Sequence, residues 1–176
     1  SIQSICLIPQ VHSPYVRRHG RHFRSPVSVC VPPAVSSPLR IFPDPPSPVL
    51  LFFHGGGWVT ESVENYDRVC SRMAQSTGHI VMSVEYRLAP EYHFPVPLED
   101  CYAAAKALYT GRLILPADPD RITIIGDSAG GNLAAAVCLM ARDKKELLPG
   151  KQILIYPAVN SCYTEKSPYK SVKTNG

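Results

Sequence analysis

The 176-residue chain has an ordinary globular composition, with 45% hydrophobic and 18% charged residues, enough for one domain with its own core. Its net charge of +4 lies within residues 1–48, which hold five arginines and one acid. The remainder is neutral and gives no indication of nucleic-acid binding. No run approaches about 18 apolar residues, so no transmembrane segment is expected, and the first residues lack the basic lead of a secretory signal.

The six cysteines are widely spaced and contain no C-x-x-C motif, so their pattern does not indicate a metal site. Cys70, Cys101 and Cys138 fall beside apolar residues in helical patterns, where a free cysteine behaves as a small hydrophobe. We therefore expect no disulfide framework and a reducing, cytoplasmic location.

The first segment, residues 1–37, is predicted to be irregular and rich in proline and arginine. Ten of the eighteen prolines lie within residues 1–48, and no helical period survives them. Short apolar runs at 27–31 and 39–42 are candidates for edge strands. The arginines between positions 17 and 24 are expected to form a solvated tail, with contact to an anionic surface as the alternative. A partial catalytic domain is predicted for residues 38–176.

A buried strand at 48–53 leads into His54-Gly55-Gly56-Gly57-Trp58. Three consecutive glycines expose backbone N–H groups, and no side chain keeps a substrate oxygen from approaching them. This pattern is typical of an oxyanion hole, which stabilises the negative charge that forms during acyl transfer. The alternative interpretation is a flexible loop.

Two predicted helices and a strand follow this loop. Ser62 is a candidate N-cap for a helix that ends at Thr77, before Gly78, and the apolar face of this helix, which includes Tyr66, is expected to contact the sheet. Residues 79–85 are predicted to form a strand. A second helix is predicted from Pro97 to Tyr109.

The loop between that strand and the second helix spans residues 86–97. Within it, Arg87 and Glu91 are interpreted as a structural ion pair or loop clamp, with a role in catalysis as the alternative. His93 is interpreted as an exposed side chain. Asp118-Pro119-Asp120 is predicted to form a turn.

The strand 121–125 runs directly into Gly126-Asp127-Ser128-Ala129-Gly130, and a helix is predicted over 131–140. A serine between two glycines at a strand-to-helix turn matches the nucleophile-elbow pattern G-x-S-x-G. The glycines are needed because the turn is tight, and the turn places the serine near the positive end of the helix. The alternative is a glycine-rich turn with an incidental serine. A last strand is predicted at 152–156, and residues from Pro157 onward show no pattern.

Strands that alternate with helices predict the α/β class, with a mostly parallel sheet and helices on both of its faces. Ligands of such sheets bind outside the carboxyl ends of the strands. The triple-glycine loop and Ser128 both follow predicted strands, so we expect them to meet at that edge.

Three motifs in this order resemble the hormone-sensitive-lipase-like serine esterases, which include the arylacetamide deacetylases and have the α/β-hydrolase fold. They are His54-Gly55-Gly56-Gly57-Trp58, Tyr86-Arg87-Leu88-Ala89-Pro90-Glu91 and Gly126-Asp127-Ser128-Ala129-Gly130-Gly131. The resemblance implies that Ser128 is the nucleophile, with Gly56, Gly57 and Ala129 as the oxyanion-hole donors. It implies a small-molecule carboxylic ester substrate with a mostly apolar acyl part. No metal or organic cofactor is expected, because a serine supplies its own nucleophile. It also implies that His54 braces the glycine loop, with Gly55, Trp58, Gly126, Asp127 and Gly130 as supporting motif positions.

The proton-transfer partners of Ser128 are not evident in this sequence. In α/β-hydrolases the order along the chain is serine, acid, histidine, yet no histidine follows Ser128. Asp143, Glu146 and Glu165 are the later acids, and none has the expected setting of a triad acid. We therefore interpret the chain as a fragment that lacks the last strands and is by itself nearly inactive and aggregation-prone. The alternatives are a non-catalytic module that binds a small ligand, and a damaged gene product.

Overall fold

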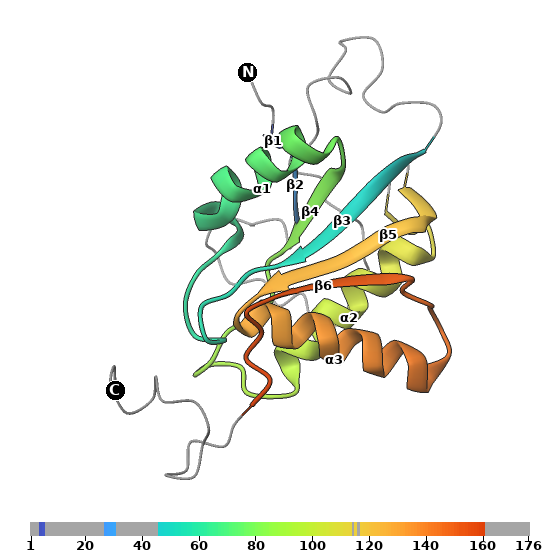
Figure 1. The fold of residues 1–176 in the computed structure, drawn as a ribbon. Coiled ribbons are helices and arrows are strands. Elements are labelled where there is room, and N and C mark those ends of the chain that lie inside the picture. Colours follow the sequence, from blue (N-terminus) through green and yellow to red (C-terminus); the bar gives the residue numbers. More distant parts are fainter. Residues whose placement is uncertain (1–3, 6–26, 31–45, 114, 116, 161–176) are drawn as a thin grey trace.

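The computed structural model describes residues 4–5, 27–30, 46–113, 115 and 117–160, which form a sheet covered by helices (Figure 1). The strands are β1 (Ser4–Ile5), β2 (Val27–Cys30), β3 (Ser47–Phe53), β4 (Ile80–Val84), β5 (Ala117–Asp127) and β6 (Lys151–Ile155). The helices are α1 (Val63–Thr77), α2 (Val96–Tyr109) and α3 (Ala129–Lys144).

The described strands lie in the order β1-β2-β4-β3-β5-β6. The four strands β4, β3, β5 and β6 are parallel, whereas β2 pairs with β4, and β1 with β2, in the antiparallel sense. Each parallel strand is joined to the next along the chain through one helix, as parallel pairing requires. The predicted α/β class with a mostly parallel sheet is confirmed.

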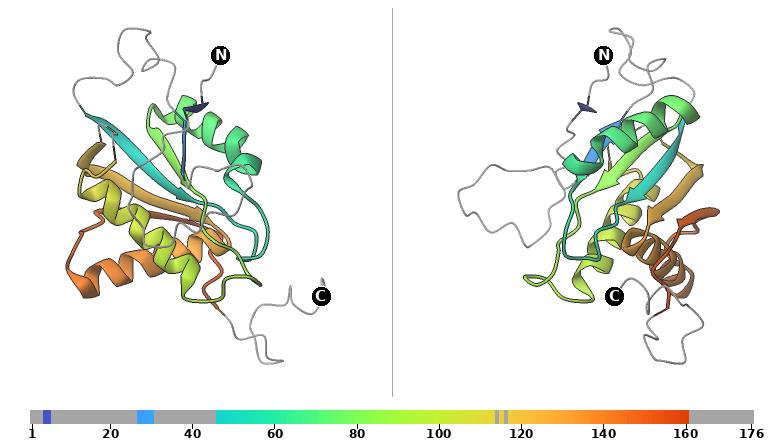
Figure 2. Two further views of the ribbon diagram at one scale, coloured as in Figure 1. Left: turned by 180° about the vertical axis from the view of Figure 1, so that it is seen from behind. Right: turned by 60° about the vertical axis from the view of Figure 1, so that its left-hand side comes forward.

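Alternating residues of the central strands face opposite sides of the sheet. Val49, Leu51 and Phe53 pack into the larger core with α2 and α3, while Leu50 and Phe52 pack with Cys70 and Ala74 of α1. Figure 2 shows α1 on one side of the sheet, and α2 and α3 on the other. Helices therefore cover both faces of the described sheet, as predicted.

Both predicted ends of α1 are confirmed. Ser62 Oγ accepts a hydrogen bond of 3.3 Å from the N–H of Asn65. Gly78 adopts a left-handed φ of 69° and donates its N–H to Ala74 O at 3.0 Å. These two caps satisfy backbone groups that a helix end leaves without partners.

Two local predictions are wrong. The turn predicted at Asp118–Asp120 belongs to β5, because Ala117 pairs with Ser47 across a register shift and so extends the strand. The side chain of Asp118 still accepts the N–H of Asp120 at 3.0 Å, which is the local bond that made the segment look like a turn. Arg87 pairs with Asp100 rather than with Glu91, because α2 brings the aspartate against the loop.

The run predicted at 27–31 forms the strand β2, but it pairs with both β1 and β4, so β2 is not an edge strand of the described sheet. The run at 39–42, the arginines between 17 and 24, Glu165 and most of the segment 1–37 lie outside the described residues. Cys30, Cys70, Cys101 and Cys138 are free thiols. The described part of the chain contains no cluster of metal-ligating side chains, and none of its helices combines the length and apolarity needed to cross a membrane.

Candidate active site

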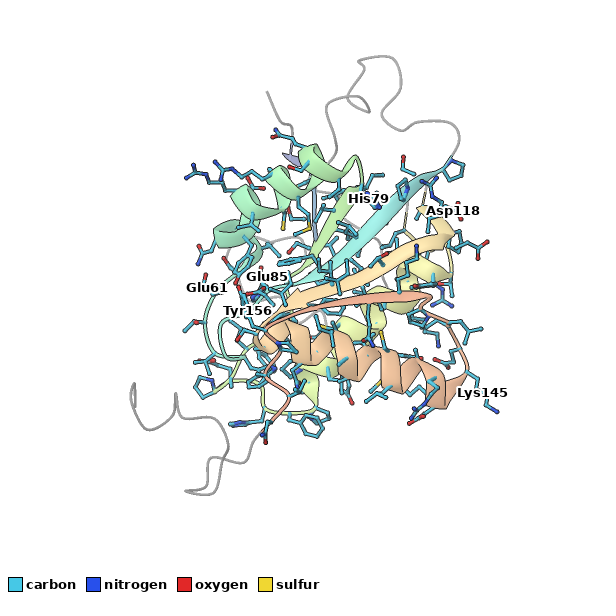
Figure 3. The ribbon with its side chains drawn as sticks, in the orientation of Figure 1. Glu61, His79, Glu85, Asp118, Lys145 and Tyr156 are labelled. Atoms are coloured by element: carbon cyan, nitrogen blue, oxygen red, sulfur yellow. The ribbon has the colours of Figure 1, made fainter. Side chains whose placement is uncertain are left out.

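The glycine loop and the serine turn leave neighbouring strands at the same edge of the sheet. Phe53, the last residue of β3, pairs in parallel with Gly126 of β5, so residues 54–58 and 127–130 emerge side by side. Figure 3 places Glu61, Glu85 and Tyr156 at this end of the molecule, and Lys145, which caps α3, at the opposite end. We call the end of the sheet at which the glycine loop and the serine turn emerge the carboxyl edge.

Ser128 occupies a strained turn between β5 and α3. Its φ and ψ of 51° and −116° lie outside the regions that L-residues ordinarily adopt. The Ser128 side chain makes no capping hydrogen bond to α3, and the residue is partly exposed, whereas Asp127 and Ala129 on either side are buried. The turn therefore presents a serine hydroxyl that the helix itself does not use.

Glycines hold this turn directly against the end of β3. A Cβ on Gly130 would overlap the carbonyl oxygens of Phe53 and His54, and a Cβ on Gly126 would overlap the backbone of Gly130. Gly55 is equally close to the turn, because a Cβ there would lie 2.6 Å from Asp127 Oδ2. The two motifs are therefore in backbone contact, and no side chain separates them.

The triple-glycine loop is itself a left-handed turn, with φ of +104° at Gly56, +62° at Gly57 and 62° at Trp58. The N–H groups of Val59 and Thr60 donate to Gly56 O at 3.1 and 2.9 Å and close the turn. Within the described residues, the N–H groups of Gly56, Gly57 and Ala129 donate to no acceptor. Three backbone donors thus remain available at the two segments that border Ser128.

His54 lies entirely below the surface, under the glycine loop. Its Nδ1 lies 2.8 Å from Gly55 O, and since a carbonyl only accepts, Nδ1 carries the proton. Burial lowers the pKa of His54, so the ring is neutral. The ring stacks on Tyr86 with centroids 4.3 Å apart, and the Tyr86 hydroxyl donates to His54 O at 2.7 Å. These contacts tie His54 to the loop backbone.

The loop that follows β4 fastens the far end of the glycine loop. The N–H of Ala89 donates to Trp58 O at 2.8 Å. Arg87 holds Asp100 of α2 through its side-chain Nε and NH2 groups, at 2.8 and 2.7 Å, and through its backbone N–H at 3.1 Å. The Arg87 guanidinium also lies 4.9 Å from the ring centroid of Tyr92.

A third segment, residues 155–160, contacts the serine turn, although the sequence showed no pattern from Pro157 onward. Ser128 donates its N–H to Ile155 O at 2.9 Å, and Ser128 O accepts the N–H of Ala158 at 3.0 Å. Asn132 Nδ2 donates to Ala158 O at 2.9 Å. Most of these bonds join backbone atoms, so no residue type in the sequence signals them.

The other described histidines and the acids Asp143 and Glu146 form no described hydrogen bond with Ser128. His79 lies at the opposite edge of the sheet (Figure 3), and His93 is exposed on its loop. Asp143 pairs with Arg142, and Glu146 with Lys106, beside the C-terminus of α3. Within the described residues, no histidine forms a hydrogen bond with Ser128.

Comparison with known proteins agrees with this geometry. The model of a family described as having the alpha/beta hydrolase fold matches residues 50–175. The chain belongs to this α/β-hydrolase family.

The relatives of this α/β-hydrolase chain include two mammalian proteins. Arylacetamide deacetylase of Oryctolagus cuniculus is 39% identical over 151 residues, which cover 82% of this chain and 36% of the relative. Neutral cholesterol ester hydrolase 1 of Rattus norvegicus is 34% identical over 139 residues, 70% of this chain and 33% of the relative. The resemblance to hormone-sensitive-lipase-like esterases is therefore confirmed.

A solved structure supports the fold. A hyperthermophilic esterase from Pyrobaculum calidifontis superposes with a TM-score of 0.70 at 40% identity, over 91% of this chain and 45% of that one. The α/β-hydrolase fold predicted from the motifs is thus confirmed. The chain spans less than half the length of each of these three proteins.

Proposed function

We propose that this chain supplies the nucleophile and the oxyanion hole of a carboxylic ester hydrolase. One observation supports this most strongly: Ser128, on a strained turn, lies against a glycine loop whose amides have no other acceptor within the described residues. Strain at such a turn is retained only where the surrounding structure enforces it, and it exposes the serine oxygen.

In the proposed reaction, Ser128 Oγ attacks the carbonyl carbon of the ester, and its proton passes to a general base. The carbonyl oxygen becomes an oxyanion, and the N–H groups of Gly56, Gly57 and Ala129 stabilise its charge. Ala129 begins α3, so the positive end of the helix dipole adds to that stabilisation. Collapse of the intermediate breaks the ester C–O bond, releases the alcohol and leaves an acyl group on Ser128. Water then cleaves the acyl-enzyme and frees the carboxylic acid.

The proposed substrate is a small ester with a mostly apolar acyl part. The relatives' names support this class, since they include an arylacetamide deacetylase and an esterase. Exposed apolar side chains on the carboxyl-edge loops support it too, among them Val59 and Tyr156, which are 52% and 74% exposed.

We further propose that residues 38–176 form part of a catalytic domain and that residues 1–176 alone turn over esters very slowly. The sequence contains no histidine after Ser128, and among the described residues no histidine forms a hydrogen bond with Ser128. We also propose a cytoplasmic location, which the four free thiols of the described part support. Subcellular fractionation tests the location, and recovery in a secreted fraction would contradict it.

The test compares p-nitrophenyl acetate hydrolysis by residues 1–176 and by the longest reading frame that contains them. We expect activity in the longer protein, with Ser128→Ala lowering kcat by roughly four to six orders of magnitude, because the covalent step is lost. Undiminished activity of Ser128→Ala would refute the proposed nucleophile. Clear turnover by residues 1–176, lost in Ser128→Ala, would refute only the proposed inactivity. Binding of an ester without turnover by the longer protein would favour a ligand-binding module.

A further inference from the structure

The hydroxyl of Tyr66 reaches from α1 to the residue that precedes the proposed nucleophile. Tyr66 Oη donates a hydrogen bond to Asp127 Oδ2 at 2.8 Å. Asp127 is only 8% exposed, and its second oxygen, Oδ1, has no partner among the described residues. Tyr66, on the helix α1 that covers one face of the sheet, thus holds the turn that leads into α3 on the other face.

The same hydroxyl also contacts the glycine loop. A Cβ built on Gly55 would lie 2.6 Å from Asp127 Oδ2 and 3.1 Å from Tyr66 Oη, so the Gly55 backbone rests on this pair. Tyr66 is therefore a single side chain in contact with both motifs of the proposed active site.

The Tyr66 ring is fixed from several directions. Its centroid lies 5.5 Å from that of Phe52 on β3 and 5.7 Å from that of His54. The start of α1 is anchored to the end of β4, because the N–H of Val63 donates to Glu85 Oε2 at 2.7 Å. With ring and helix both held, the position of the hydroxyl is determined by the fold rather than by a free rotamer.

The helical spacing of apolar residues in α1 predicts only that Tyr66 packs against the sheet. Phenylalanine would serve that purpose equally well, and it would not bring a hydroxyl that needs a partner. Burial, followed by the bond to Asp127, raises the pKa of Tyr66 to about 12, so the hydroxyl stays protonated and remains a donor in the neutral range. The observed contacts thus use the part of the side chain that packing alone does not require.

We propose that Tyr66 and Asp127 form a positioning pair that sets the separation between Ser128 Oγ and the N–H groups of the glycine loop. This inference rests on the proposed function. Neither side chain touches the substrate in the proposed reaction, and both act through the backbone of Gly55 and Ser128. Oxyanion stabilisation depends on donors held about 2.7–3.1 Å from the developing charge, so a small displacement of either segment lowers the rate of acyl transfer.

The test compares the kcat and KM of Tyr66→Phe and Tyr102→Phe variants of the protein encoded by the longest reading frame that contains this chain. Tyr102 is a matched control, because its hydroxyl also donates to a carboxylate at 2.8 Å, that of Glu146 near the C-terminus of α3. We expect Tyr66→Phe to lower kcat about tenfold to hundredfold, as a displacement of order 1 Å does, with little change in KM. Tyr102→Phe should leave kcat unchanged. Equal kcat values in the two variants, or a change confined to KM, would overturn the inference.

A second pair of variants separates positioning from folding. Asp127→Asn keeps an oxygen that accepts from Tyr66, whereas Asp127→Ala keeps none, so kcat should fall less in Asp127→Asn. In the double variant Tyr66→Phe/Asp127→Ala, kcat should be no lower than in Asp127→Ala alone, because both changes remove one interaction. Additive losses would contradict the pair. Ser128→Ala distinguishes a failure of the proposed function from a failure of the positioning pair. Activity that survives in Ser128→Ala refutes the proposed function. Activity that is lost in Ser128→Ala but intact in Tyr66→Phe refutes the positioning pair alone.

Discussion

Two tyrosine–carboxylate hydrogen bonds of equal length lie at opposite ends of this molecule. Tyr66 donates to Asp127 at the carboxyl edge, and Tyr102 donates to Glu146 beside the C-terminus of α3, both at 2.8 Å. Burial, with the bond to the carboxylate as the next cause, raises the pKa of each tyrosine to about 12. As isolated contacts they are nearly identical.

Their surroundings differ. Asp127 adjoins a strained serine and a glycine backbone packed too closely for any Cβ, whereas Glu146 is shared with Lys106 on the surface. One bond therefore holds backbone that the proposed chemistry needs, and the other ties α2 to the end of α3. The comparison shows that the effect of a hydrogen bond on function depends on the segments it joins.

The largest expected effect comes from filling the contact between the serine turn and β3. In Gly130→Ala the new methyl group would overlap two backbone carbonyl oxygens, which cannot move without displacing β3. We expect the free energy of unfolding to fall by more than about 4 kcal/mol, measured by urea denaturation or as loss of folded protein. The control is Gly150→Ala, before β6 at the other end of the molecule, because no atom lies within 4 Å of a Cβ added there. Its free energy of unfolding should change by less than about 1 kcal/mol. A stable Gly130→Ala protein would show that the two motifs are not in contact.

A smaller effect is expected from the clamp between the 86–97 loop and α2. Asp100→Ala removes three hydrogen bonds to Arg87, whose side chain is 40% exposed. Hydrogen bonds to charged groups contribute about 1.5–3 kcal/mol, and solvent screening reduces this contribution. We therefore expect the free energy of unfolding to fall by about 1–2 kcal/mol in Asp100→Ala. The matched control is Arg142→Ala, because Arg142 pairs with Asp143 in the exposed last turn of α3 at 71% and 67% exposure. Its expected effect is below about 0.5 kcal/mol, and an equal loss in both variants would contradict a special role for the clamp.

The smallest expected effect is a pH dependence of stability that arises at Glu146, at the end of the molecule opposite the carboxyl edge. Hydrogen bonds from Lys106 and then Tyr102 lower the pKa of Glu146 below its ordinary value of 4.5. A carboxylate with a lowered pKa stabilises the folded state above its unfolded pKa, and this stabilisation is lost as pH falls through the folded value. The Tm of Glu146→Gln should therefore lie slightly below that of the original protein at pH 7, and the gap should close in acid below pH 4.5. A gap that widens on acidification would reverse the assigned sign.

Local sequence signals determined most of the fold. Nearly continuous burial of strands such as β3 follows from runs of apolar residues, and Ser62 and Gly78 mark the ends of α1. The two glycine motifs were placed at one edge because parallel strands that alternate with helices end together. These inferences need only neighbouring residues and one topological rule.

What the sequence did not predict depends on contacts between distant segments. Asp100 follows Arg87 by thirteen positions, and only the packing of α2 against the loop selects it over the nearer Glu91. Tyr66 and Asp127 are 61 positions apart, and a tyrosine on an apolar helix face resembles any other core residue. The contacts of residues 155–160 with the serine turn join mostly backbone atoms, which every residue type provides.

The central claim is that the Ser128 hydroxyl and the glycine-loop amides meet at one carbonyl-sized position. The most direct measurement is a crystal structure of the protein encoded by the longest reading frame that contains this chain. The protein is first reacted with a p-nitrophenyl alkylphosphonate, whose adduct mimics the tetrahedral intermediate. We predict a bond between phosphorus and Ser128 Oγ, with a phosphonyl oxygen about 2.7–3.1 Å from the backbone nitrogens of Ala129 and of Gly56 or Gly57. A folded protein that forms no adduct at Ser128, or an adduct whose oxygen points away from these amides, would contradict the account.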